Sequence, residues 1–180
     1  MSRHYEDSTV EVIEALHNGL RVETGIANVT DTPSLLFQTD AILPLFNVYG
    51  SIRINLLFGE VTTVFGAGAA VGMFMFQSTS PVIAVAAMSI DCASVAALAK
   101  GARITLQGDL VGTAPTITGA AGVSYWPVSH GKMIIGQDDG VGHIELLTAT
   151  GLPTSIASGA MSFTLCYSPI SEGAYATPIF

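Results

Sequence analysis

The side chains with the greatest capacity for chemistry lie in the last third of the chain. They are two histidines and three carboxylates, namely His130, Asp138, Asp139, His143 and Glu145. Imidazole and carboxylate groups bind zinc, iron or manganese, and neighbouring aspartates can bind calcium. If the Asp-Gly dipeptide forms a hairpin turn, His143 and Glu145 fall on one face of the outgoing strand. The solvent face of an edge hairpin explains the same spacing without a metal, and we favour that interpretation.

Other catalytic motifs are absent from the sequence. There is no G-x-G-x-x-G after a strand, no P-loop lysine and no G-x-S-x-G elbow. Ser129-His130 is not accompanied by an acid at motif spacing, so His130 is interpreted as a loop histidine. Gly66-Ala67-Gly68 resembles a phosphate loop, but no helical pattern follows it, and we expect a bulge or bend in a long strand.

Glu60 interrupts an apolar, strand-like passage. A carboxylate in such a place needs a partner, which Arg53 or Arg103 could supply across strands. We therefore interpret Glu60 as structural. The sequence predicts no catalytic residue, no cofactor and no metal site, and we expect a protein that is not an enzyme.

Residues 51–76 form the passage around which the chain is organised. Ile52, Ile54, Leu56 and Phe58 alternate with other residues at the period of two that predicts one buried sheet face. After the glycine-rich break, apolar residues occupy both faces, which indicates a strand covered by a second layer or by another subunit.

Shorter strands with turn signals between them predict the rest of the fold. Pro44 predicts an edge strand or the start of a strand at residues 43–50, and residues 91–101 are expected to form one helical turn or a wide loop. Residues 132–135 and 143–149 are expected to pair as a hairpin. The fold class is all-β, an antiparallel sandwich or jelly-roll-like domain. Further strands are expected at residues 82–90, 104–107 and 161–167.

The first 24 residues are expected to form a separate arm, followed by a β-sandwich domain at residues 25–170 and a tail at residues 171–180. A capping box at Ser8 and Glu11 predicts a short helix over residues 9–17. Its narrow apolar stripe, Val10, Ile13 and Leu16, packs either on its own domain or on a neighbouring subunit, and the sequence leaves both open.

Composition excludes some partners and favours others. The net charge of −8 argues against nucleic acid. No uninterrupted apolar run is long enough for a membrane helix. The two cysteines, Cys92 and Cys166, are expected to be free and buried. Only 11% of the residues are charged and the mean hydropathy is +0.55, so we expect apolar surface covered by other copies of the chain.

Two passages resemble a group of tailed-bacteriophage virion proteins. They read FNVYGSIRINLLFGEVTTVFGAGA and MSIDCASVAALAKGARITLQGD, with Gly59-Glu60-Val61-Thr62-Thr63, Gly66-Ala67-Gly68 and Ile90-Asp91 as the matching residues. The likeness covers residues 45–168 and excludes the acidic N-terminus. It implies a small β-rich capsid decoration, or cement, protein that forms trimers and binds the major capsid protein.

We therefore expect a homotrimeric decoration protein, found in the virion and assembled in the host cytoplasm. Its core or interface residues are expected to include Phe58, Phe65, Phe74, Phe76 and Trp126. One alternative is a receptor-binding or tail-tip β domain that contacts host glycan through Tyr125 and Trp126. A second alternative is a small cupin-like metal enzyme that uses His130, His143 and Glu145.

Overall fold

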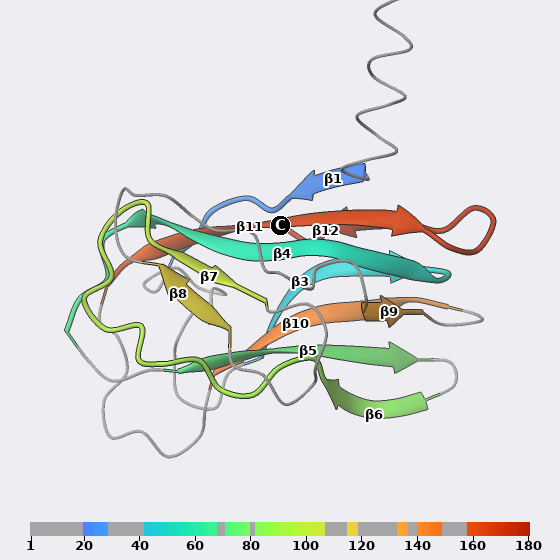
Figure 1. The fold of residues 1–180 in the computed structure, drawn as a ribbon, viewed down its shortest axis with the longest axis horizontal. Helices are drawn as coiled ribbons and strands as arrows, with labels where there is room; N and C mark the ends of the chain where they lie inside the picture. The colour runs from blue at the N-terminus through green and yellow to red at the C-terminus, as the bar shows by residue number, and fades with distance from the viewer. Residues whose placement is uncertain are drawn as a thin grey trace, which may run out of the picture.

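The computed structural model describes residues 20–28, 42–67, 71–79, 82–106, 115–118, 133–136, 140–148 and 158–180. These residues form two antiparallel β-sheets and contain no helix (Figure 1). The prediction of an all-β fold is confirmed. The expected helix at residues 9–17 lies outside the described residues.

The first sheet, called sheet A, has seven strands and is built around its longest strand, β4. Strand β11 pairs along one edge of β4, while β7 and β9 pair in succession along the other edge. The order is β1-β11-β4-β7-β8, with β2 also on β11. The strands are β1 (Leu20–Glu23), β2 (Ala27–Asn28), β4 (Ile52–Thr63), β7 (Arg103–Thr105), β8 (Thr116–Thr118), β9 (Met133–Ile135) and β11 (Ala160–Pro169).

The second sheet, sheet B, has five strands in the order β12-β3-β10-β5-β6. Its central strand, β10, is antiparallel to both neighbours. Successive strands often cross from one sheet to the other, so that most neighbours within a sheet are far apart in sequence. The strands are β3 (Ile42–Tyr49), β5 (Gly72–Thr79), β6 (Val82–Ala87), β10 (Gly142–Thr148) and β12 (Tyr175–Pro178).

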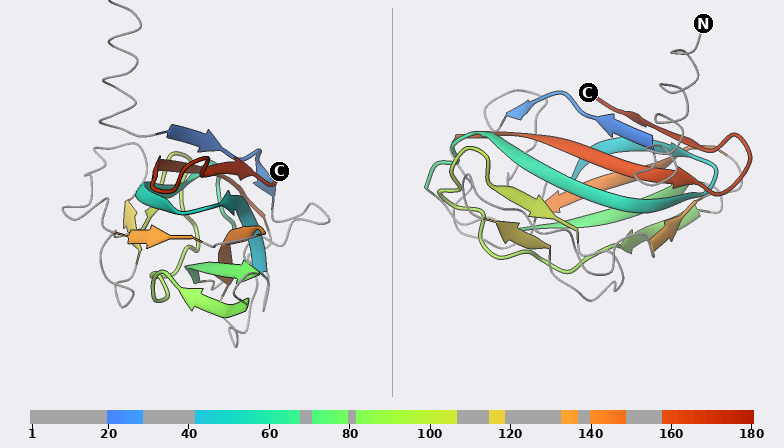
Figure 2. Two further views of the ribbon diagram at one scale, coloured as in Figure 1. Left: turned by 90° about the vertical axis from the view of Figure 1, so that its right-hand side faces the viewer. Right: turned by 45° about the horizontal axis from the view of Figure 1, so that its top comes forward.

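The core fills the space between the sheets. Figure 2 shows the two layers from other directions. Phe163 and Leu165 of sheet A, and Phe46, Phe74 and Ile144 of sheet B, are all fully buried in one apolar cluster. Burial of large apolar side chains is the main favourable term in folding. The sandwich therefore owes its stability chiefly to this shared layer.

The alternation expected along residues 52–58 changes phase within β4. Ile52 and Ile54 are buried, as expected, but the next core positions are Leu57 and Val61, and Phe58 lies on the outer face. The reason is a register shift against β11, where Cys166 pairs with Leu56 and Tyr167 with Ile54. Asn55 is thus an extra residue, and one inserted residue moves every later side chain to the opposite face.

Of the two alternatives predicted from Pro44, the start of a strand fits, since β3 begins at Ile42, whereas β3 is not an edge strand as a whole. β3 lies between β12 and β10, but β12 pairs only with residues 46–49. On the side of β3 that faces β12, Pro44 therefore has no paired residue. On the other side, the register with β10 shifts between Ile144 and Glu145. Proline is tolerated here because it lies at a bulge and beyond the end of the neighbouring strand.

Residues 88–101, which we call the strap, link the two sheets along one side of the sandwich. At its start, Met88 and Cys92 donate backbone hydrogen bonds to Phe74 and Gly72 of sheet B. At its end, Gly101 donates to Val61 of sheet A. The prediction left a helical turn or a wide loop open at this place; the structure has a loop without a helix.

The opposite side of the sandwich is formed by the edge strands β1 and β12, which lie side by side. Gly25 donates a backbone hydrogen bond to Phe180 across this side, and Ile179 donates to Leu45. Residues 20–24 and 175–178, expected to belong to an arm and to a tail, are therefore integral parts of the two sheets.

The hairpin predicted around the Asp-Gly dipeptide is wrong. β9 pairs with β4 in sheet A, whereas β10 pairs with β3 and β5 in sheet B. The chain between them crosses from one sheet to the other. Local turn chemistry did not reveal that both strands have stronger, non-local partners.

Truncating a central core side chain tests this account of stability. We expect Phe74→Ala to lower the free energy of unfolding by about 3–5 kcal/mol, through lost burial and the cavity that remains. The matched control is Ile134→Ala on exposed β9, expected to cost less than about 0.5 kcal/mol. Urea denaturation measures both, and equal effects would contradict the placement of the core.

Candidate functional site

The structure places His143 and Glu145 on the outer face of sheet B. Both lie on β10, and the intervening Ile144 is fully buried in the core. They are therefore on one face, as predicted, but in the central strand of the sheet and not on an edge hairpin. His143 is half-buried and Glu145 is only 5% exposed.

Among the described residues, no cation or hydrogen-bond donor offsets the burial of the Glu145 carboxylate. Its Oε2 atom is buried and has no hydrogen-bond partner. The residue opposite it on β5 is Met75, which is also buried. Burial disfavours the charged carboxylate and so raises the pKa of Glu145 above its ordinary value. This position reduces stability at neutral pH.

The structure describes only part of the group of histidines and carboxylates considered as metal ligands. His130, Asp138 and Asp139 lie outside the described residues, and within the described part no three metal-ligating side chains come together. The Nδ1 atom of His143 is buried and unpartnered. The two predicted residues that can be placed share a face, but by themselves they do not form a metal site.

A row of polar side chains crosses sheet B beside Glu145. Strand register puts Thr177 of β12 opposite Asn47 of β3, Asn47 opposite His143, and His143 opposite Gln77 of β5. Directly opposed residues share a face. We call these four residues the polar row. Each of them is half-buried, and no hydrogen bond of their side chains is found among the described residues.

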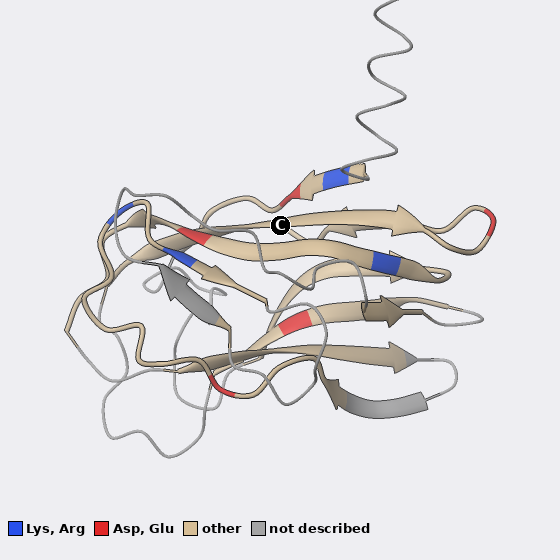
Figure 3. Ribbon diagram, viewed as in Figure 1, with Lys and Arg blue, Asp and Glu red and all other residues tan. Residues whose placement is uncertain are grey.

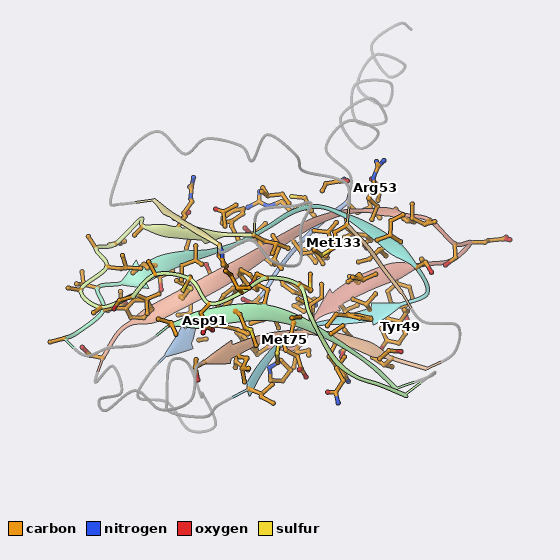
Figure 4. The ribbon with its side chains drawn as sticks, turned by 60° about the horizontal axis from the view of Figure 1, so that its bottom comes forward. Tyr49, Arg53, Met75, Asp91 and Met133 are labelled. Atoms are coloured by element: carbon orange, nitrogen blue, oxygen red, sulfur yellow. The ribbon has the colours of Figure 1, made fainter. Side chains whose placement is uncertain are left out.

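Two stacked tyrosines flank the polar row. Tyr49 and Tyr175 are opposite each other on β3 and β12, with ring centroids 4.4 Å apart and planes inclined by 15°. Tyr175 is 45% exposed. Figure 4 shows Tyr49 near one end of sheet B and Met75 in its middle part. The pair was not predicted from the sequence, because residues 171–180 were expected to form a tail; the Tyr-Ala-Thr alternation at residues 175–177 was the signal.

The outer faces of the two sheets differ in charge. On sheet A, Arg103 binds Glu60, with Nη2 to Oε2 at 2.7 Å and Nε to Oε2 at 2.8 Å, and Arg21 pairs with Glu23. Among the strands of sheet B, the only Lys, Arg, Asp or Glu is the buried Glu145 (Figure 3). Of the two partners predicted for Glu60, Arg103 is the one that binds it.

The glycine break is a crossing between the sheets and not a bend in one strand, which corrects the prediction. β4 ends at Thr63 in sheet A, and β5 begins at Gly72 in sheet B. Both backbone groups of Gly66 are used: its N–H donates to Ser158 and its carbonyl accepts from Ala97 of the strap. A backbone already bonded in this way does not cradle a phosphate.

The cysteines are free, as predicted, although Cys166 is only half-buried. Burial raises the pKa of the Cys92 thiol, and also that of Cys166, where nearby Arg21 opposes the effect. A raised pKa keeps a thiol protonated and weakens it as a nucleophile.

The aromatic candidates fall into two groups. Phe65, Phe74 and Phe76 are buried in the core. Phe58 lies on the outer face of sheet A, with the Arg103 guanidinium 5.4 Å from its ring centroid. The remaining candidates lie outside the described residues; they are Val10, Ile13, Leu16, Tyr125 and Trp126.

Exposed apolar side chains gather along the β1/β12 side of the sandwich. Ten large apolar side chains are exposed in the described part; besides Tyr175 on the outer face of β12, five of them lie here or at the start of the neighbouring strand β3. We call this group the apolar edge. The most exposed member is Ile26, at 60%, beside the Gly25–Phe180 hydrogen bond. The members are Leu20, Ile26, Ile42, Ile179 and Phe180.

Comparison with protein-family models, with curated protein sequences and with solved structures gives no match. Within the described residues, no helix is long and apolar enough to cross a membrane. The interpretation of function therefore depends on the geometry of this chain and on the resemblance noted in its sequence.

Replacing Glu145 tests whether its burial is costly. A raised folded-state pKa means that the folded protein binds more protons, so stability falls as pH rises above the unfolded-state value of about 4.3. We expect Glu145→Gln to increase the free energy of unfolding by about 1 kcal/mol at pH 8 and by almost nothing at pH 4.

Urea denaturation across this pH range measures the effect of the substitution. The control is Glu172→Gln, because Glu172 is exposed and its replacement should change little at either pH. A Glu145→Gln variant that is equally or less stable at pH 8 would contradict the assignment.

Proposed function

We propose that this chain is a non-enzymatic structural protein of a tailed-phage virion, a capsid decoration protein that assembles as a homotrimer. The observation that carries the proposal is the apolar edge. Five large apolar side chains are exposed together along one side of a sandwich whose described part has only nine charged side chains, four basic and five acidic. Such surface is usually covered by a partner.

The strand order supports a finer proposal about the fold. Chain order alternates between the sheets: β3 in sheet B, β4 in sheet A, β5 and β6 in sheet B, β7 in sheet A, β10 in sheet B and β11 in sheet A. We infer that β1, β11, β4 and β7 oppose β3, β10, β5 and β6 as the two sheets of a jelly roll. Viral capsid domains, lectins and cupins use this architecture, so the fold alone does not choose among them.

The mechanism we propose is adhesion by many weak contacts. A trimer that binds three capsid subunits at once turns the second and third contacts into intramolecular events, which raises the overall affinity without any tight single site. Because the described part carries few charged side chains, its contact with the capsid is expected to depend more on burial of apolar surface than on electrostatic attraction between the partners.

The cupin-like enzyme receives less support from the geometry. Of the metal ligands proposed for it, the structure describes His143 and Glu145, and both lie on the outer face of sheet B. Ile144, between them, points into the interior, which apolar side chains fill. The glycan-binding alternative was based on Tyr125 and Trp126, which lie outside the described residues.

The solution mass tests the proposed assembly. We expect light scattering on a sizing column to give three times the mass of one chain, both for the full chain and without residues 1–19, because the apolar edge belongs to the sandwich. The double variant Ile26→Asp, Ile179→Asp should elute as a folded monomer, since charge desolvated in an interface is costly.

The control is Ile134→Asp, which changes an isoleucine on β9 that is as exposed as Ile26 and should remain trimeric. A full-length chain that stays monomeric at high concentration would overturn the proposed assembly. The virion role is tested separately by sedimenting the trimer with shells of the major capsid protein of the same phage, and failure to cosediment would overturn it.

A further inference from the structure

We propose that the outer face of sheet B binds a neutral saccharide, with the tyrosine pair as its stacking platform and the polar row as its hydrogen-bonding groups. This inference goes beyond the proposed virion role and does not depend on it. It is built on described side chains from four adjacent strands: β12, β3, β10 and β5.

The platform comes from the stacked tyrosines. Tyr175 belongs to the edge strand β12, so one face of its ring is covered by Tyr49 and the other is turned away from the sheet. An exposed aromatic ring that is already fixed by stacking loses little freedom when a ligand binds. The CH groups on one face of a pyranose ring pack on such a surface, and the phenolic hydroxyl adds a polar contact.

The polar row supplies donors and acceptors in a line. Adjacent strands are about 4.8 Å apart, so Thr177, Asn47, His143 and Gln77 extend as a ladder across the sheet from beside the tyrosines. The amides of Asn47 and Gln77 each donate and accept. The same capacities are needed to recognise sugar hydroxyls, which also donate and accept.

The surface beyond the row is not a flat open sheet. Met75 and Glu145, the next outward residues on β5 and β10, are 2% and 5% exposed. The row lies between these two buried residues and the tyrosines.

The lack of exposed charged side chains on the strands of this face indicates which class of ligand it binds. No exposed Lys, Arg, Asp or Glu belongs to the strands of sheet B. The described residues of this face offer no cation to a phosphate or acidic ligand and no basic cluster to an anionic membrane surface. A neutral saccharide, apolar on its ring faces and polar around its rim, matches both components of the site.

Saturation-transfer NMR on the full chain tests the proposal. The probes are the neutral oligosaccharides cellotetraose, maltotetraose and chitotetraose, with an anionic heparin tetrasaccharide for comparison. We expect at least one neutral probe to bind with a Kd of about 1 mM and the anionic probe not to bind. Tyr175→Ala should weaken binding by about tenfold or more, while Tyr175→Phe should retain it.

Two further variants distinguish loss of the binding site from a general effect of substitution on the protein. Gln77→Ala, at the far end of the polar row, should also weaken binding and serves in place of Tyr175→Ala if that variant does not fold. Ile134→Ala, on sheet A, should leave binding unchanged. The absence of transfer to every neutral probe would overturn the proposal, as would binding that survives both Tyr175→Ala and Gln77→Ala.

The solution mass of the variants distinguishes this proposal from the assembly proposal. We expect Tyr175→Ala to lose saccharide binding and remain trimeric. If it becomes monomeric and the wild-type chain binds no saccharide, the face is a protein contact and the saccharide proposal is wrong, whereas the trimer itself still stands.

Discussion

The pairing of β10 with β3 on one side and β5 on the other is the interaction on which both faces of sheet B depend. Its register places Ile144 and Leu146 in the core opposite Phe76 and Phe74. The same register necessarily lines up Asn47, His143 and Gln77 on the outer side, because side chains alternate along a strand. A slip by one residue would expose the core set and bury the polar row. Burial of the inner face thus fixes the geometry of the outer one.

Glu145 shows what this constraint costs. Its position is dictated by the strand that carries it, and its carboxylate is nearly buried without a partner for Oε2. On sheet A the comparable acid, Glu60, lies next to Arg103 and is half-exposed. The acid on sheet A is therefore paired and partly exposed, whereas the acid on sheet B is buried and its Oε2 atom has no partner. Natural domains usually tolerate an uncompensated buried polar group only where something other than stability maintains it.

The fold class was predictable from the sequence because alternation, glycine and proline are local signals, and most strands follow them. The pairing of the strands was not. Asp138-Asp139-Gly140 suggested a hairpin, yet β9 and β10 lie in different sheets, since their partners come from segments far away in sequence. The extra residue Asn55 reverses the faces of β4, and a bulge leaves no compositional mark. Tyr175 and Tyr49 could be recognised as a pair only once β12 was placed beside β3.

The strap is fixed to both sheets by backbone hydrogen bonds, and to sheet B also by the side chains of Ser89 and Cys92, which accept from Phe74 and Gly72. Met88, Cys92, Ala97 and Gly101 each donate from the backbone N–H, a group that every residue except proline provides. Its exposed side chains are consequently open to sequence drift, apart from core contacts such as that of Val95. Distant relatives of this chain should therefore keep the length of the strap and avoid proline at its four donor positions. Its buried residues Met88, Ser89, Cys92 and Val95, and Gly101 with its positive φ of 85°, are less free to change.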